Sequence, residues 1–101
     1  MERESASEAL AALAQPARLA TFSVIAEAGD DGLPVGEVAR RLNARQNTTS
    51  THLGVLARAH VVTAQRVGKS VIYKVNQDVL GSLIAFLEAF TPKPNGSPKV
   101  G

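Results

Sequence analysis

Residues 46–58 read Gln-Asn-Thr-Thr-Ser-Thr-His-Leu-Gly-Val-Leu-Ala-Arg, and this stretch decides the fold. On a helix, at about 100° per residue, one side collects residues suited to a core, namely Thr49, Leu53, Leu56 and Ala57. The opposite side collects Asn47, Thr48, Thr51, Val55 and Arg58. Because Asn and Thr can pair with base edges and phosphates, and Val can contact the thymine methyl group, the pattern predicts a DNA recognition helix.

A second short helix precedes this stretch. Residues 36–42 place Val38, Ala39 and Leu42 on one side, and Asn43 tolerates the left-handed conformation at which helices commonly end. Two short helices joined by a tight turn, the second polar on its outer face, form a helix-turn-helix.

The residues after the recognition helix change from helical to strand-like patterning. Residues 61–67 and 70–75 are rich in β-branched side chains and flank Gly68-Lys69, which is a hairpin signal. Three basic residues belong to this hairpin, namely Arg66, Lys69 and Lys74. We expect a basic wing beside the recognition helix.

Two helices are expected before the helix-turn-helix. Ser5 and Glu8 fit a capping box, and an apolar stripe follows at Ala9, Leu10, Ala12 and Leu13. Pro16 ends this helix and suits the first turn of another over residues 17–28. The residues of this second helix available to the core are Leu19, Ala20, Phe22, Ile25 and Ala26. Residues 29–32 read as a loop.

The last expected helix, residues 78–90, is apolar on nearly every side. A domain of this size has too little surface to bury such a helix completely, so the pattern predicts a second copy of the chain as partner; the alternative is a buried helix in a monomer. The candidate dimer-interface residues are Leu10, Leu13, Leu80, Leu83, Ile84, Leu87 and Phe90. Residues 91–101, with three prolines, read as a disordered tail.

Together these elements give a fold that is mainly α with a small β-hairpin wing: four helices, two strands and a fifth helix, a winged helix-turn-helix. With 101 residues we expect one DNA-binding and dimerisation domain over residues 1–90. Cysteine is absent, which excludes disulfides and thiolate metal ligands. No apolar run reaches the roughly 18 residues of a membrane span, and the first residues lack a signal-peptide pattern, so we expect a cytoplasmic protein with no membrane partner.

Charge is distributed unevenly along the chain. Residues 38–77 contain no Asp or Glu, whereas seven of the nine carboxylates lie within the first 37 residues. The basic residues of the central stretch are Arg40, Arg41, Arg45, Arg58, Arg66, Lys69 and Lys74. A polyanion partner, double-stranded DNA, would use this region; the alternative is a solvated face.

The chain resembles the ArsR/SmtB-type winged-helix repressors from about Leu10 to Phe90. The resemblance rests on residues 12–19 (ALAQPARL), 35–42 (VGEVARRL), 46–53 (QNTTSTHL) and 66–73 (RVGKSVIY). It implies a homodimer built from the first and last helices, a pseudo-palindromic operator, and repression that a signal relieves. The chain departs from metal-sensing members because it has no cysteine and its last helix has no histidine. We therefore expect no cofactor, no metal site, and no cysteine-based metal or redox sensing.

The candidate DNA-binding residues share the recognition helix, its entrance and the wing. They are Arg45, Gln46, Asn47, Thr48, Ser50, Thr51, His52, Val55, Arg58, Arg66 and Lys69. For Asn47, Thr48 and Thr51 the competing interpretation is local hydrogen bonding to the backbone. Capping or packing competes for Ser50, and packing for His52. Arg40 and Arg41 are further candidates for phosphate contact, whereas Arg18 reads as structural.

Two residues, one in the recognition helix and one after it, occupy positions where the backbone conformation or the lack of a side chain matters. His60 takes a place where relatives often have glycine, and histidine tolerates positive φ. Gly54 lies inside the recognition helix, where it permits close approach of a phosphate or a helix, or is simply tolerated.

Other classes of function fit less well. An enzyme is not expected, because the chain has two histidines, no cysteine and no Gly-rich phosphate loop. A winged helix that binds protein or RNA would have to explain why carboxylates are missing from the helix-turn-helix and the wing together, and weak, salt-insensitive DNA binding would favour it. A protein that binds DNA without sequence preference is a further alternative. The sequence does not separate a regulator released by a small apolar or anionic inducer from one without an inducer.

Overall fold

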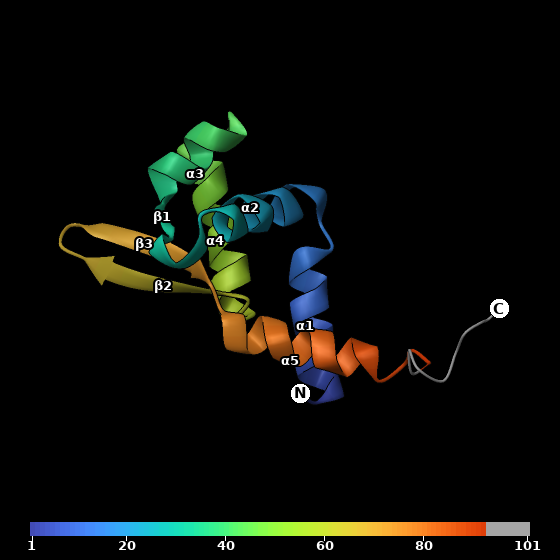
Figure 1. The fold of residues 1–101 in the computed structure, drawn as a ribbon. Coiled ribbons are helices and arrows are strands. Elements are labelled where there is room, and N and C mark those ends of the chain that lie inside the picture. Colours follow the sequence, from blue (N-terminus) through green and yellow to red (C-terminus); the bar gives the residue numbers. More distant parts are fainter. Residues whose placement is uncertain (93–101) are drawn as a thin grey trace.

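The computed structural model describes residues 1–92 (Figure 1). Its elements follow in the order α1 (Arg3–Leu13), α2 (Pro16–Glu27), a 3₁₀ turn (Gly29–Asp31), β1 (Leu33–Pro34), α3 (Val35–Leu42), α4 (Gln46–Arg58), β2 (Val62–Val67), β3 (Ser70–Val75) and α5 (Gln77–Glu88). The mainly helical fold with a hairpin wing is confirmed. The predicted tail, residues 91–101, lies outside the described residues except for Thr91 and Pro92.

The helix-turn-helix forms where the sequence predicts it. Helix α4 spans Gln46–Arg58 and buries Leu53 and Leu56 completely. Thr49 is also buried, and its hydroxyl donates to the carbonyl of Arg45 at 2.9 Å, so its polar atom has a partner. Asn43 ends α3 in the left-handed conformation (φ 53°), as expected.

The wing contains one strand more than expected. The sheet order is β1-β3-β2, both pairs antiparallel, with Leu33 opposite Tyr73 and Pro34 opposite Ile72. Pro34 is tolerated because β1 is an edge strand and needs no second ladder. A strand of two residues is too short for a recognisable alternation, so the sequence shows only an entrance to α3 here.

Gly32 is the glycine that this arrangement requires. Its φ is +67°, and a Cβ atom there would lie 2.6 Å from the carbonyl oxygen of Tyr73 and 2.6 Å from Cγ of Lys74. The loop pattern of residues 29–32 does not reveal this close approach, because it arises only when β1 pairs with β3.

The first helix begins earlier than expected, and the predicted capping box is wrong. Helix α1 starts at Arg3 with Glu2 as its N-cap, and no side chain caps it. The Ser5 hydroxyl instead donates to the Glu2 carboxylate at 3.2 Å. Ala6, Ala9 and Ala12 face the core, so small side chains let α1 approach its neighbours closely.

Helix α2 lies at the centre of the helical part and contacts α1, α3 and α4. Ile25 and Thr21 are its buried residues, and the Thr21 hydroxyl donates to the carbonyl of Ala17 at 2.8 Å. The expectation that Leu19, Ala20 and Ala26 belong to the core is wrong, because all three are exposed. Helix α2 has apolar residues on both its buried and its exposed sides, so the sequence pattern does not identify the side that faces the core.

The turn between α1 and α2 is held by side chains of Gln15 and Arg18. The Gln15 side chain accepts from the Arg18 backbone amide at 2.8 Å. The Arg18 guanidinium donates to the carbonyls of Ala12 (2.6 Å) and Ala11 (3.2 Å) at the end of α1. The structural role expected for Arg18 is confirmed.

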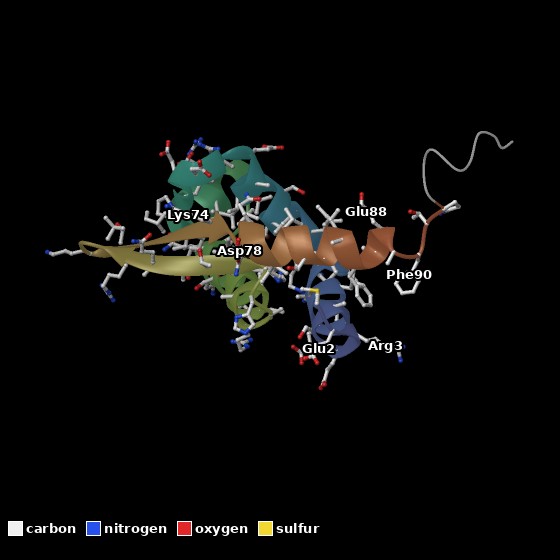
Figure 2. The ribbon with its side chains drawn as sticks, turned by 60° about the horizontal axis from the view of Figure 1, so that its bottom comes forward. Glu2, Arg3, Lys74, Asp78, Glu88 and Phe90 are labelled. Carbon is white, nitrogen blue, oxygen red and sulfur yellow. The ribbon has the colours of Figure 1, made fainter. Side chains whose placement is uncertain are left out.

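Helix α5 packs beside α1 (Figures 1 and 2). Part of its apolar surface is left uncovered. Asn76 caps it by accepting from the Val79 amide at 3.3 Å, and Leu83 is the residue it buries. Ile84 is 50% exposed and Phe90, beyond the helix end at Glu88, is 74% exposed. Leu83, at 4% exposed, packs within its own chain and offers a partner little surface, unlike the other expected interface residues.

Among residues 1–92, each helix taken singly is too short or too polar to cross a membrane. Only α1 and α2 taken together meet the requirement for length and apolar character, and the chain bends by 96° between them.

Candidate nucleic-acid interface

The exposed face of α4 carries most of the predicted recognition residues. Those on α4 that are exposed are Gln46, Asn47, Thr48, Ser50, Thr51 and Arg58. Arg45, the N-cap of the helix, is also exposed and has no side-chain capping bond. His52 and Val55 are half-buried. The buried positions 49, 53 and 56 therefore fix which side of the helix these groups present.

Two of these polar groups are engaged locally. The Asn47 side-chain oxygen accepts from the Thr48 amide at 2.8 Å, and the Thr51 hydroxyl donates to the Asn47 carbonyl at 3.1 Å. These bonds leave the Asn47 side-chain NH₂ free as a double donor and leave the Thr51 oxygen as an acceptor. Local hydrogen bonding, the competing interpretation, therefore orients these side chains without exhausting their capacity to bind a ligand.

A polar groove of about 440 Å³ separates the start of α4 from the wing. Gln46 and Ser50 from α4 line one side, and Lys69 from the hairpin turn lines the other. The structure thus brings together three predicted residues that are up to 23 positions apart in sequence (69 minus 46). The remaining lining residues, which the sequence did not single out, are Pro34, Val35, Gly36, Ser70, Val71 and Tyr73.

His52 and Val55 lie toward the flanks of α4. His52 borders a pocket of about 210 Å³ between α2 and α4, together with Ala20, Thr21 and Leu42. Val55 packs against the core cluster. The packing interpretation raised for His52 is thus supported by its half-buried position against alanine, leucine and threonine neighbours.

The wing carries its charges on the hairpin. Arg66 and Lys69 are exposed, whereas Lys74 is half-buried. The Lys74 stem lies where a side chain at Gly32 would have to go, so Lys74 also covers the link between β1 and β3. Of the three basic residues expected to serve the wing, Arg66 and Lys69 are the accessible ones.

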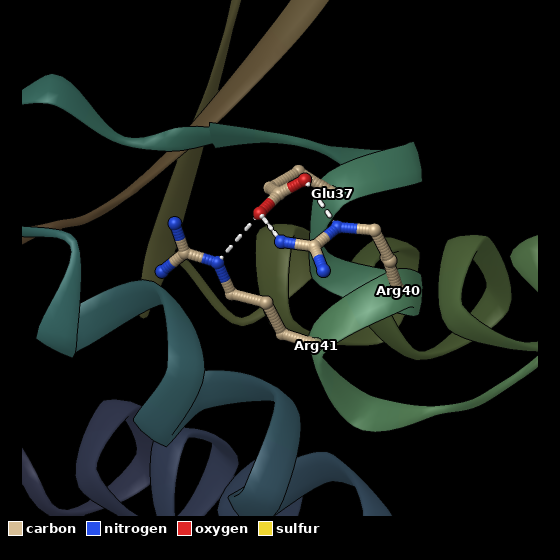
Figure 3. Close-up of polar contacts among 3 residues, drawn as sticks. All are labelled: Glu37, Arg40 and Arg41. Carbon is tan, nitrogen blue, oxygen red and sulfur yellow. Dashed lines mark hydrogen bonds and ion pairs between the residues drawn. The ribbon is translucent and has the colours of Figure 1, made fainter.

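Arg40 and Arg41 share a carboxylate partner on α3 (Figure 3). Arg40 donates to Glu37 from Nε at 2.9 Å and from Nη2 at 2.5 Å, and Arg41 Nε donates to it at 2.8 Å. The Arg40 hydrogen bonds, followed by those of Arg41, lower the pKa of the Glu37 carboxyl from 4.5 to about 2. The same pairing raises the pKa of Arg40. Both guanidiniums therefore pair with an internal anion, and their contact with DNA phosphates stays a prediction.

Two backbone expectations near α4 have different outcomes. His60 has a φ of 66°, so its predicted left-handed conformation is confirmed. A Cβ atom at Gly54 would meet Arg58 Nη1 at 3.5 Å, which is ordinary contact, so no neighbouring helix requires glycine there. Close approach of a phosphate at Gly54 stays a prediction.

Metal-binding groups do not cluster in residues 1–92: no three His, Cys, Asp or Glu side chains are placed to hold one ion. Asp78 and Glu88, the two carboxylates of α5, lie at opposite ends of the helix (Figure 2).

The chain is similar to known regulators in sequence. A family described as "Helix-turn-helix domain" matches residues 13–64, which cover α2, α3 and α4. The biofilm growth-associated repressor of Agrobacterium fabrum is 38% identical over 85 residues, or 84% of this chain and 70% of that protein. The uncharacterized HTH-type transcriptional regulator YbzH of Bacillus subtilis is 35% identical over 57 residues, 56% of this chain and 57% of that protein.

Solved structures share the fold over most of the chain. An ArsR-like transcriptional regulator from Rhodococcus sp. RHA1 superposes with a TM-score of 0.75 at 21% identity, covering 85% of this chain and 78% of the other. The transcriptional repressor BigR from Xylella fastidiosa gives a TM-score of 0.63 at 25% identity, covering 92% and 100%. With its exposed polar α4, its hairpin wing and these relatives, the chain belongs to the ArsR-type winged helix-turn-helix family of transcriptional regulators.

Proposed function

We propose that the protein is a homodimeric repressor that binds a pseudo-palindromic operator and blocks transcription. The observation that carries this proposal is the surface of α4. One side of this helix is buried against the rest of the chain, and the opposite side exposes amide, hydroxyl and guanidinium groups next to a basic wing. A helix of this kind fits the major groove, where base edges carry a distinct pattern of donors and acceptors.

The proposed contacts divide by chemistry. Asn47, Thr48 and Thr51 read base edges, since they share the exposed face of α4 near its start. The groove between Gln46, Ser50 and Lys69 receives the DNA backbone, because it is polar and one of its walls is basic. The remaining proposed contacts, to phosphates or flanking bases, come from Arg45, His52, Val55, Arg58 and Arg66.

The proposed dimer uses the uncovered apolar residues of α1 and α5. Leu10, Ile84, Leu87 and Phe90 are between 40% and 74% exposed, and Leu13 and Leu80 are half-buried beside them. Such a patch is typical of a protein interface. A similar solved structure, the winged helix-turn-helix domain Mb0332 from Mycobacterium bovis, is described as homodimeric, with a TM-score of 0.69 at 22% identity. Two copies would then present two α4 helices to half-sites about one helical turn apart.

Any signal that releases the proposed repressor acts without a cysteine of this chain, because the chain contains none. A small apolar or anionic inducer and the absence of any inducer are both compatible with the pockets described.

The deciding experiment is selection of bound fragments from a genomic DNA pool at physiological salt, followed by sequencing. We expect enrichment of an inverted repeat whose half-sites are about one helical turn apart. Recovery of fragments without a common motif would contradict sequence-specific binding and leave a non-specific DNA-binding protein. Recovery of no DNA would favour a winged helix that binds protein or RNA.

A further inference from the structure

Glu37 makes both ion pairs found among residues 1–92. Its carboxylate accepts from Arg40 and Arg41, one helical turn further along α3, and all three side chains lie on the exposed side of that helix (Figure 3). The Glu37 side chain is only 27% exposed, whereas that of Arg40 is 71% exposed, so the carboxylate lies beneath a guanidinium that faces solvent.

This cluster borders the surface proposed to bind DNA. Gly36 lies against the first residue of α4, since a Cβ atom there would be 3.5 Å from Gln46 Oε1. Arg40 follows Gly36 by four residues and therefore lies on the same face of α3. Gly36 and Gln46 both line the groove that ends at Lys69. A guanidinium at position 40 is consequently placed next to the proposed path of the DNA backbone.

Glu37 is a carboxylate at the edge of the most basic part of the chain. It is the last carboxylate before the acid-free stretch of residues 38–77, and it pairs with two of the seven basic residues in that stretch while offsetting one positive charge. Phosphate contacts from Arg and Lys supply affinity that does not depend on sequence. A carboxylate at this position removes part of that affinity.

We propose that Glu37 is an internal competitor of DNA phosphate, which holds Arg40 and Arg41 away from the DNA backbone and so lowers the sequence-independent part of DNA affinity. The inference rests on the proposed DNA-binding function of the same surface. Its consequence is that operator binding depends more on the base contacts of α4 than the number of basic residues suggests.

The opposite role makes the opposite prediction. If Glu37 held the guanidiniums in place for contact with phosphate, its removal would weaken DNA binding. If the cluster lay away from the DNA, its removal would change binding only through net charge. The sign and the salt dependence of the effect separate these cases.

The test compares Glu37→Gln with Glu27→Gln by fluorescence anisotropy on a random-sequence duplex. Both variants remove one negative charge, but Glu27 is an exposed residue at the end of α2 that forms no ion pair with any other residue of the stretch 1–92. Each new phosphate contact should make binding fall roughly 3.5-fold further between about 50 mM and about 200 mM salt, since the slope changes by about 0.9 per contact. We expect Glu37→Gln to bind the duplex more tightly than the parent at low salt, with a salt slope steeper by the amount of one or two phosphate contacts. Glu27→Gln should have the same affinity and salt slope as the parent.

A second pair of variants closes the cycle. Arg40→Gln with Arg41→Gln should cancel the gain in the Glu37→Gln background, because the triple variant has neither guanidinium left to contact phosphate. Unfolding in urea checks that each variant is folded. Weaker binding by Glu37→Gln, or binding equal to that of Glu27→Gln, overturns the proposal.

The failure of this inference is distinguishable from failure of the proposed function. If the parent selects an inverted repeat but Glu37→Gln shows no gain, only the competitor role is lost. If the parent selects no repeat but Glu37→Gln gains salt-dependent affinity, the competitor role stands and sequence-specific repression does not.

Discussion

The helix-turn-helix with its wing and the pair α1 and α5 expose opposite kinds of surface. The first region buries the apolar side of α4 within the chain and presents mainly amide, hydroxyl and basic groups, although Val67 of the wing is 55% exposed. The second leaves Leu10, Ile84, Leu87 and Phe90 in solvent. Figure 1 shows the hairpin extending away from the side on which α1 and α5 lie together. The contrast teaches that one small core supports two surfaces suited to different partners, a polyanion and a second apolar surface.

Breaking the apolar surface should have the largest effect. Ile84→Glu combined with Leu87→Glu places charges on the exposed side of α5 and should convert a dimer into a monomer. Loss of the second recognition helix should weaken operator binding by about 10²- to 10⁴-fold. Sedimentation and operator titration measure both effects. Leu19→Glu, on an exposed leucine of α2, serves as control; a variant pair that stays dimeric would locate the interface elsewhere.

Truncating one leucine in each region should change the free energy of unfolding by different amounts. Leu53→Ala, at a fully buried position of α4, should lower the free energy of unfolding by about 2–5 kcal/mol. Leu87→Ala, 42% exposed on α5, should cost roughly 1 kcal/mol or less in the isolated chain. Urea unfolding at two protein concentrations tests this, because only the Leu87→Ala loss should depend on concentration. Equal losses at all concentrations would mean that Leu87 has no partner.

Within the polar region, a base contact and a phosphate contact should behave differently. Asn47→Ala should weaken operator binding by about 1–3 kcal/mol and relax base preference, while random DNA is bound as before. Competition titrations with operator variants measure this. Unchanged preference at every operator position would remove Asn47 from the base-reading group.

Lys69→Ala should act on all sequences alike. Removing one phosphate contact from the wing should reduce the salt slope of binding by about 1, for the operator and for random DNA. Anisotropy at several salt concentrations gives the slope. A loss confined to the operator would mean that Lys69 reads sequence.

The smallest effect concerns acid stability. The pKa of Glu37 is about 2 in the folded chain against an ordinary 4.5, so the folded state binds fewer protons between these values. Its stabilising contribution is complete above pH 4.5 and is lost as pH falls toward 2. Urea unfolding across this range should show a steeper acid loss in the parent than in Glu37→Gln. Parallel pH profiles would argue against the Glu37 pairing.

The helix-turn-helix was predicted from sequence more completely than helix α2. Helix α4 has the predicted bounds, and Asn43 and His60 have the left-handed backbone expected of them. In α2, by contrast, Thr21 is buried while Leu19 is exposed. Periodicity identifies a buried face when the other face is polar, and α2 is apolar on both. The assignments of individual residues to DNA and to the dimer stay predictions.

The sequence by itself determined the order of the main elements, the face that α4 buries and the basic character of its surroundings, because these follow from local spacing and composition. The tertiary structure decided the pairing of β1 with β3, the need for glycine at position 32, the groove between α4 and Lys69, and the exposure of the outer side of α5. Each of these depends on contacts between segments distant in the chain, which local patterns do not encode. The Glu37 cluster combines both kinds of information. Its three residues are close together in sequence, on one helix, but only the folded chain places that helix beside the first turn of α4.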